Sequence, residues 1–243
     1  MKALVVDDER LARRELRRLL RDHPEIQVVG EASNAPEARE ALGDLKPDLL
    51  FLDVQMPGES GFDLLESLPT VPWVVFTTAF DDYALRAFEV SALDYLVKPI
   101  EPSRLARSVE RVLREWTQSQ DVAVDTSRSE GMLRPDHRVF LKDGDRCWFV
   151  ALAKVRLFES EDNYVRVHLE DANPLILRSL NELEEKLDDR AFFRANRSQI
   201  VNLRAIQSVH PWFGERLMVR VEGGHEVVLS RRRTREFRQQ MSV

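Results

Sequence analysis

The chain of 243 residues is long enough for one large domain or two modest ones. Its hydrophobic content of 43% and charged content of 32%, with a net charge of −6, describe an ordinary soluble protein. No apolar run approaches the ~18 residues of a membrane span, and the N-terminus is strand-like rather than a secretory signal. The single cysteine, Cys147, excludes a disulfide framework and a thiolate metal site. We therefore expect a cytoplasmic protein without membrane attachment.

Charge is distributed unevenly along the chain. Residues 1–130 hold 16 Lys+Arg and 25 Asp+Glu, whereas residues 191–243 hold 10 and 4. A basic C-terminal segment on an acidic protein suggests a polyanionic partner for that segment. A solvated charged face explains the charge alone equally well.

Residues 1–118 alternate short apolar runs with helical patterns, which is typical of a parallel sheet covered on both faces. The predicted strands are Lys2–Val6, Gln27–Gly30, Leu49–Asp53, Trp73–Thr77 and Asp94–Val97. The predicted helices are Arg10–Asp22, Ala35–Leu45, Phe62–Leu68, Tyr83–Glu89 and Ser103–Gln118. We therefore predict a five-stranded α/β domain over residues 1–118, followed by a polar linker over residues 119–136.

Residues 137–243 change to a period of two with short apolar segments, which predicts a mainly β domain. The predicted strands are Arg138–Lys142, Cys147–Ala151, Val155–Ser160, Tyr164–Leu169, Leu175–Arg178, Gln207–His210, Arg216–Glu222 and Glu226–Leu229. One helix is predicted at Leu180–Leu187, where Ser179 and Glu182 resemble a capping box.

Charged side chains stand where three of the predicted parallel strands end. Asp7 and Asp8 follow the first strand, Asp53 ends the third and Lys98 follows the fifth. Open α/β sheets bind ligands at this edge. Three carboxylates and one ammonium suit a metal-assisted phosphoryl acceptor, because the phosphoryl charge must be neutralised and Mg²⁺ prefers oxygen ligands. Singly, Asp7-Asp8 would more often mark a helix start and Lys98 a solvated loop.

Four stretches resemble the receiver domain of two-component response regulators: Val5–Glu9, Asp53–Pro57 with Gly61, Thr77-Thr78-Ala79 and Tyr95–Pro99. The resemblance implies a doubly wound sheet in the order 2-1-3-4-5, which is known for this family. It also implies that Asp53 is the phosphoacceptor, that Asp7, Asp8 and Asp53 bind Mg²⁺, and that Lys98 contacts the phosphoryl group. Thr78 and Tyr95 match the switch pair of the family, although singly they would be a turn hydroxyl and core filling.

Four stretches of the second domain are similar to the LytTR DNA-binding domain: Glu159–His168, Phe192–Asn202, Pro211–Phe213 and Val228–Arg233. The resemblance implies a β module that reads DNA with loops and strand ends instead of a recognition helix. The base or backbone contacts that it implies are Asn163, Arg197 and Arg231. The phosphate contacts are Lys154, Arg194, Arg232 and Arg233.

Several polar residues of the second domain also fit a purely structural role. Arg231–Arg235 could be a solvated run that opens a terminal helix, and Asn163 could be only a turn residue. Arg197 could pair with Glu182 or Glu184. His168, which alternates with apolar neighbours, fits a surface strand position.

Together the two resemblances indicate a LytR/AlgR-type response regulator, a DNA-binding transcriptional regulator and not an enzyme. The implied partners are a cognate sensor histidine kinase, which phosphorylates Asp53, and duplex DNA with promoter repeats. Phosphorylation is expected to favour a homodimer, through a surface that includes Phe80, Tyr83 and Arg86. The rival hypotheses are an aspartate-nucleophile phosphohydrolase, for which Gln55 cannot supply the general acid, and a β domain that engages protein or RNA.

Overall fold

The computed structural model describes residues 1–79, 94–120, 132–144 and 146–241, which form two compact units. The N-terminal unit comprises Met1–Ala123, Arg138–Phe140 and Gly144–Phe149. The C-terminal unit comprises Val124–His137, Leu141–Asp143 and Val150–Val243. The predicted helix Tyr83–Glu89, the surface around Phe80, Tyr83 and Arg86, and residues 121–131 of the predicted linker lie outside the described residues.

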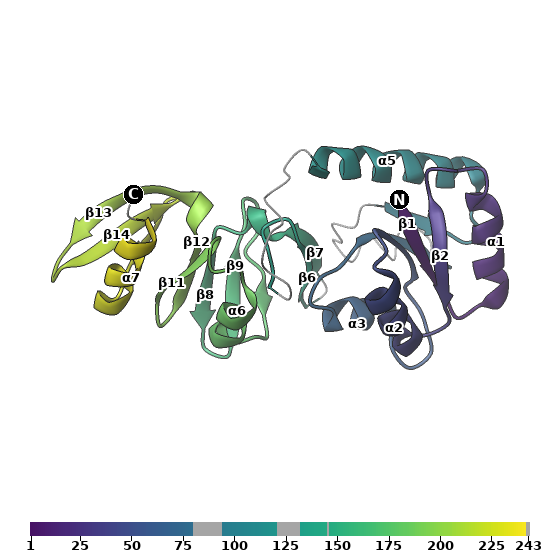
Figure 1. Cartoon of the computed structure of the whole chain (residues 1–243). Coiled ribbons are helices and arrows are strands. Elements are labelled where there is room, and N and C mark those ends of the chain that lie inside the picture. Colours follow the sequence, from purple (N-terminus) through teal and green to yellow (C-terminus); the bar gives the residue numbers. More distant parts are fainter. Residues whose placement is uncertain (80–93, 121–131, 145, 242–243) are drawn as a thin grey trace. The chain divides into compact units, whose positions relative to one another are not determined.

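A five-stranded sheet in the order β2-β1-β3-β4-β5 forms the centre of the N-terminal unit, and all of its strands are parallel (Figure 1). Its strands are β1 (Lys2–Val6), β2 (Gln27–Ala32), β3 (Leu49–Asp53), β4 (Trp73–Thr78) and β5 (Asp94–Val97). The predicted strand order is confirmed. Only the ends of two strands differ, because β2 continues to Ala32 and β4 to Thr78.

Helices cover both faces of this sheet, as the alternating pattern predicted (Figure 1). Helices α1 (Arg10–Leu20) and α5 (Pro102–Gln120) bury their leucines and valines on one face. Helices α2 (Ala35–Leu45) and α3 (Gly61–Ser67) cover the other. Helix α1 ends two residues before the predicted Asp22, and α5 extends two residues past Gln118. Within the described ranges, no helix combines the length and the apolar character that crossing a bilayer requires.

A β-hairpin that was predicted to open the second domain contributes to the N-terminal unit. It consists of β6 (Arg138–Asp143) and β7 (Arg146–Ala151). The Phe140 ring stacks on Phe62 of α3 at 6.3 Å between centroids, and the Arg138 guanidinium lies 3.7 Å from the centroid of the Trp73 ring. The compact units therefore do not divide at residue 137, because the apolar side of this hairpin extends the core beside α3.

Two antiparallel sheets form the C-terminal unit, in the orders β10-β9-β8-β12-β11 and β13-β14-β15. The strands are β8 (Leu157–Glu161), β9 (Tyr164–His168), β10 (Leu175–Ile176), β11 (Phe192–Asn196), β12 (Gln199–Asn202), β13 (Ile206–Trp212), β14 (Arg216–Val221) and β15 (His225–Val228). The mainly β prediction is confirmed. Strands β11 and β12 were recognised only as a motif, and β10 is shorter than the predicted Leu175–Arg178.

In the part of this unit that the structure describes, two α-helices and two short 3₁₀ turns accompany the sheets. The helices are α6 (Leu180–Lys186) and α7 (Arg231–Met241), and the turns are η1 (Leu152–Lys154) and η2 (Leu203–Ala205). The predicted capping box of Ser179 and Glu182 is present at the start of α6. The arginine run after Ser230 opens α7, and the Ser230 hydroxyl accepts the Arg233 N–H at 3.3 Å as an N-cap would.

The last residues of the predicted linker are packed on α6. Leu133 donates its N–H to Lys186 O at 2.6 Å and accepts the Asp188 N–H at 3.0 Å. A backbone bridge thus joins Leu133 to the segment after α6, and the Leu133 side chain is buried. The end of the predicted linker, residues 119–136, thus contacts the C-terminal unit through Leu133.

Candidate functional site

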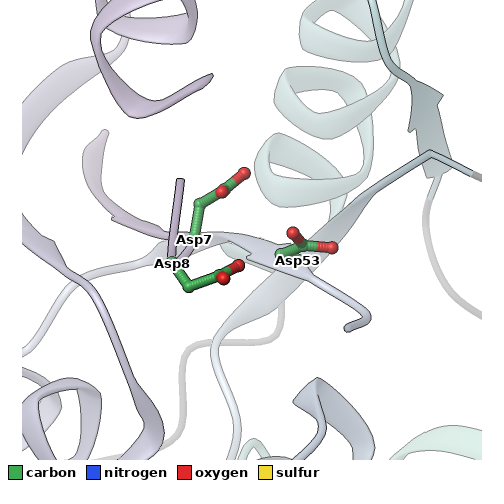
Figure 2. A group of neighbouring side chains, drawn as sticks. All are labelled: Asp7, Asp8 and Asp53. Carbon is green, nitrogen blue, oxygen red and sulfur yellow. The ribbon is translucent and has the colours of Figure 1, made fainter. Parts of the chain in front are cut away.

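The three predicted carboxylates meet at the carboxyl edge of the parallel sheet. Val6 pairs with Leu52, so Asp7 and Asp8 after β1 lie beside Asp53 at the end of β3 (Figure 2). Their ligand oxygens all lie within 4.8 Å of one another. Asp7 and Asp53 are buried, while Asp8 is exposed. A set of oxygen donors that faces solvent on one side fits Mg²⁺, which keeps several waters when it binds to carboxylates.

Lys98 completes this cluster, which we call the acidic notch (Asp7, Asp8, Asp53 and Lys98). Its Nζ lies 2.8 Å from Asp7 Oδ2 and 2.7 Å from Asp53 Oδ2. Its backbone N–H donates to Thr78 O at 2.7 Å, which fixes the end of β5 against the end of β4. All four residues of the site are therefore brought together as predicted.

Backbone donors orient the two buried carboxylates. Asp7 Oδ1 accepts the Glu9 N–H at 2.9 Å, and Asp53 Oδ1 accepts the Gln55 N–H at 3.1 Å. The second oxygen of each carboxylate faces Lys98, so both side chains are held in one orientation before any ligand enters. Preorganised charges of this kind need little rearrangement when a charged group arrives.

Burial and charge act in opposite directions on the acidic notch. Burial raises the pKa of the Asp53 carboxyl above its ordinary value, although the hydrogen bonds from Lys98 and Gln55 oppose that rise. Burial alone would lower the pKa of Lys98, but its hydrogen bonds to Asp53 and Asp7 outweigh it, so the pKa is raised. Lys98 therefore stays an ammonium at neutral pH, available to a phosphoryl oxygen.

Gly61 allows α3 to begin directly against the end of β3. A Cβ at this position would lie 2.4 Å from the carbonyl oxygen of Asp53 and 3.0 Å from the Leu52 side chain. Since backbone cannot move aside as a flexible side chain can, only glycine fits here. Gly61 is one of the residues on which the resemblance to the receiver domain rests. The close approach of its Cα to the Asp53 carbonyl oxygen follows only from the fold.

The predicted switch residues lie on the two strands next to the notch. Thr78 is buried at the end of β4, and Tyr95 is half-buried on β5. The Arg104 guanidinium lies 5.3 Å from the centroid of the Tyr95 ring and forms an ion pair with Asp94 at 2.6 Å. The sequence did not predict that Arg104 would contact Tyr95 and Asp94. The one feature of the sequence that could have suggested these contacts is the position of Arg104 in the first turn of α5.

Three of the predicted DNA contacts lie at one end of the C-terminal unit. Asn163 stands in the β8–β9 turn, Arg197 in the β11–β12 turn and Arg231 at the start of α7, and all three are exposed. Hydrogen bonds from Ser160 N–H to Ser198 O (2.8 Å) and from Ser230 N–H to Ala195 O (2.9 Å) hold these segments side by side. We call Asn163, Arg197 and Arg231 the loop face.

Two arginines predicted as phosphate contacts are engaged within the protein. Arg194 donates to Asn196 O at 2.6 Å and to Arg197 O at 2.7 Å, so it holds the turn that carries Arg197. Arg233 forms ion pairs with Glu184 and Glu236. Glu184 also forms an ion pair with Arg194 at 3.4 Å, so it pairs with both Arg194 and Arg233. Among the described residues, no ion pair joins Glu184 to Arg197.

The other two predicted phosphate contacts are exposed but lie in different places. Arg232 is next to the loop face, with an i,i+4 ion pair to Glu236 at 3.4 Å. Lys154 stands in η1, before β8 begins at Leu157, whereas Asn163 follows the other end of that strand. A five-residue strand spans about 17 Å, so the structure does not bring Lys154 together with the loop face.

His168 is buried, with an exposed fraction of 7%, so its expected place on the surface of a strand was wrong. Its Nε2 lies 3.1 Å from Glu159 Oε2, and its ring centroid is 4.5 Å from that of His225. Burial lowers the pKa of His168, and Glu159 opposes the shift while His225 and Arg166 add to it.

A doubly wound sheet with this acidic notch and a separate β unit defines a response regulator. Residues 3–110 match the family model of the response regulator receiver domain, and residues 145–242 match that of the LytTr DNA-binding domain. The chain is 36% identical to the sensory transduction protein LytT of Enterococcus faecalis and 34% identical to LytT of Bacillus subtilis, in each case over 100% of both chains. It is also 29% identical, again over 100% of both chains, to the transcriptional regulatory protein YpdB of Escherichia coli.

The chain therefore belongs to the LytT-type response regulators, which combine a receiver with a LytTR DNA-binding domain. It is a two-component transcriptional regulator. The receiver lies in the N-terminal unit, with the acidic notch, and the LytTR match lies almost entirely in the C-terminal unit.

Proposed function

We propose that phosphorylation of Asp53 by a cognate sensor histidine kinase controls how the chain binds promoter DNA. One observation carries this proposal: Lys98 Nζ lies 2.8 Å from Asp7 and 2.7 Å from Asp53, inside a cluster of three carboxylates. Such a site combines a nucleophilic oxygen with the positive charge that an arriving phosphoryl group needs. The cytoplasm, where a sensor kinase would present its phosphohistidine, is the compartment that this function requires.

The transfer follows from the chemistry of the two side chains. A carboxylate oxygen of Asp53 attacks the phosphorus of the phosphohistidine, a P–O bond forms, and the P–N bond breaks with its electron pair left on the imidazole nitrogen. Asp7, Asp8 and Asp53 would hold Mg²⁺, which neutralises phosphoryl charge when bound. Lys98, released from Asp53, pairs with a phosphoryl oxygen.

The conformational switch begins when phosphorylated Asp53 loses its ion pair with Lys98. The acyl phosphate carries a charge of roughly −1.5 to −2 in place of the single negative charge of the carboxylate, and it has three phosphoryl acceptor oxygens. Lys98 and the Thr78 hydroxyl are drawn towards these oxygens, and Tyr95 follows Thr78. The surface at β4 and β5 changes and favours a homodimer, which sets two loop faces on adjacent DNA repeats. Two linked sites raise the effective concentration of each other without any new contact.

Phosphoryl uptake can be tested with a small donor. The full-length chain is incubated with acetyl phosphate and Mg²⁺ and weighed by intact mass spectrometry. We expect one phosphoryl group on the wild type, none on Asp53→Asn, and none when EDTA removes the metal. Asp44→Asn changes an exposed carboxylate of α2 and serves as the control. Undiminished uptake by Asp53→Asn would place the acceptor elsewhere.

Control of DNA binding needs a second measurement. A duplex is selected from a random pool by the wild type, and its binding is followed by fluorescence anisotropy. Phosphorylated wild type is expected to bind more tightly and more cooperatively than Asp53→Ala. Equal affinity and cooperativity would refute phosphorylation control. Duplex binding with little salt dependence would instead favour a protein or RNA partner, because phosphate contacts release counterions.

A further inference from the structure

The β13–β14 hairpin of the C-terminal unit carries two exposed aromatic side chains at its end. Trp212 has an exposed fraction of 39% and Phe213 of 81%, and their ring centroids are 5.8 Å apart. We call this pair the aromatic tip. A single exposed apolar residue is ordinary, but two large rings at the point of a hairpin form a contact surface that folding leaves unused.

The backbone holds the aromatic tip in place. Gly214 and Glu215 have φ values of +69° and +61°, and Trp212 pairs with Arg216 across the hairpin. Arg216 also donates its Nε–H to Phe213 O at 3.0 Å, which closes the turn. Because the turn is already ordered, a partner would not have to order the backbone that presents Phe213, and binding loses little conformational entropy.

The aromatic tip is continuous with the loop face. Leu229 donates its N–H to Leu217 O at 2.8 Å, so the end of β15 runs beside the start of β14. A Cβ placed on Gly214 would lie 3.4 Å from the Arg231 guanidinium. A polyanion held by Arg231 would therefore lie within reach of Phe213.

Charge around the aromatic tip favours nucleic acid over a second copy of the chain. Arg216 donates to the backbone of Phe213, Arg231 lies near Gly214 and the exposed Arg232 follows, while Glu215 is the acidic residue of the turn. Rings framed by cations match the minor groove of DNA, in which sugars and base edges lie between two rows of phosphates. Two copies meeting tip to tip would bring their own arginines together, which is unfavourable.

We propose that the aromatic tip is an apolar wedge that contacts the minor groove of duplex DNA beside the segment held by the loop face. This inference rests on the proposed DNA-binding function and adds a contact that carries no charge. The wedge therefore contributes affinity without releasing counterions, whereas the arginines of the loop face contribute both affinity and salt dependence.

The salt dependence of binding separates these two contributions. The full-length chain and its variants are titrated, over a range of salt concentrations, against the fluorescein-labelled duplex that the wild type selected. We expect Phe213→Ala to weaken binding about tenfold with the salt slope unchanged. We expect Arg231→Ala to reduce the slope by about 0.9. Phe213→Leu, which keeps an apolar side chain, should recover part of the affinity.

Leu177→Ala is the matched control. Leu177 has an exposed fraction of 74% and follows β10, the edge strand at the other side of the larger sheet. The Leu177→Ala substitution removes a similar exposed apolar surface at a distance from the aromatic tip and the loop face. We expect this variant to bind the duplex with wild-type affinity. A tenfold loss in this variant as well would show that exposed apolar area acts nonspecifically and would overturn the wedge.

A hydroxyl-radical footprint adds a readout of position, because the radical attacks deoxyribose from the minor groove. Phe213→Ala should lose one protected minor-groove segment and keep the others. If the wild type selects no duplex from the random pool, the proposed function itself fails. If the wild type binds and Phe213→Ala matches it, only the wedge is overturned. A change in self-association by sedimentation equilibrium, with DNA affinity intact, would identify a second copy as the partner and would also overturn it.

Discussion

The acidic notch and the loop face are built by different kinds of sheet. In the notch, each charged residue that the sequence singled out at a strand end takes its place, and Lys98 contacts both buried carboxylates. At the loop face, Asn163, Arg197 and Arg231 come together, while Arg194 and Arg233 are engaged by the protein and Lys154 lies at the far end of β8.

Strand direction explains this difference. In a parallel sheet all strands end at the same edge, so a residue after one strand lies near a residue after the next. In an antiparallel sheet neighbouring strands end at opposite ends of the sheet, so a residue after one strand lies near a residue that precedes the next. A residue's place directly after a strand therefore predicts which other side chains lie near it in the N-terminal unit, but not in the C-terminal unit.

The largest expected effect concerns the close packing of the notch. Gly61→Ala puts a methyl group against the Asp53 carbonyl, and we expect a loss of about 3 kcal/mol in the free energy of unfolding. Urea unfolding measures it. Gly43→Ala is the control, because nothing lies within 4 Å of its added Cβ inside α2, and it should stabilise by about 0.5–1 kcal/mol. Equal effects of the two changes would mean that α3 shifts freely away from β3.

The next prediction separates a positioning arginine from a contacting one. Arg194→Ala frees the carbonyls of Asn196 and Arg197 from their donor, and we expect a loss of about 1–2 kcal/mol in stability by urea unfolding. Arg204→Ala, at an exposed arginine of η2, should change stability very little. If Arg194→Ala kept wild-type stability but lowered the salt slope of DNA binding, Arg194 would be the phosphate contact that the sequence implied.

A smaller effect is expected from pH in the C-terminal unit. The folded pKa of His168 lies below the ordinary value near 6.5, so the unfolded chain takes up the proton more readily. Stability should therefore be fully present above pH 6.5 and decline as pH falls through the folded pKa. Urea unfolding at several pH values should show a shallower decline in His168→Gln. The same flattening in His210→Gln, an exposed histidine, would speak against His168 as the cause.

The smallest expected effect is at Lys154. Lys154→Ala should leave both the affinity for duplex DNA and its salt slope at wild-type values, because the side chain lies about a strand length from the loop face. Arg197→Ala, measured in the same anisotropy titration, should reduce the slope by about 0.9. A similar reduction in Lys154→Ala would show that bound DNA wraps around both ends of the sheet.

Among the described residues of the N-terminal unit, element boundaries were predictable to within two residues. Apolar strands buried on both faces and helices with a leucine stripe have clear periods, and caps such as Asn34 and Ser60 mark where helices start. Strands β11 and β12 were harder, because Phe192 and Phe193 are consecutive and both buried, which breaks the alternation of a half-exposed strand. Local sequence patterns also could not predict that the β6–β7 hairpin packs beside α3, because its contact joins Phe62 to Phe140, which are far apart in the sequence.

The sequence by itself indicated the class of the protein and singled out the residues of its acidic notch, because strand ends that recur along the chain converge in a parallel sheet. The strand order of the receiver came with the resemblance to its family. Tertiary structure alone decided which arginines are available to DNA, why Gly61 is required, and that Trp212 and Phe213 stand exposed beside Arg231. Those outcomes depend on contacts between distant segments, whose partners no local pattern identifies.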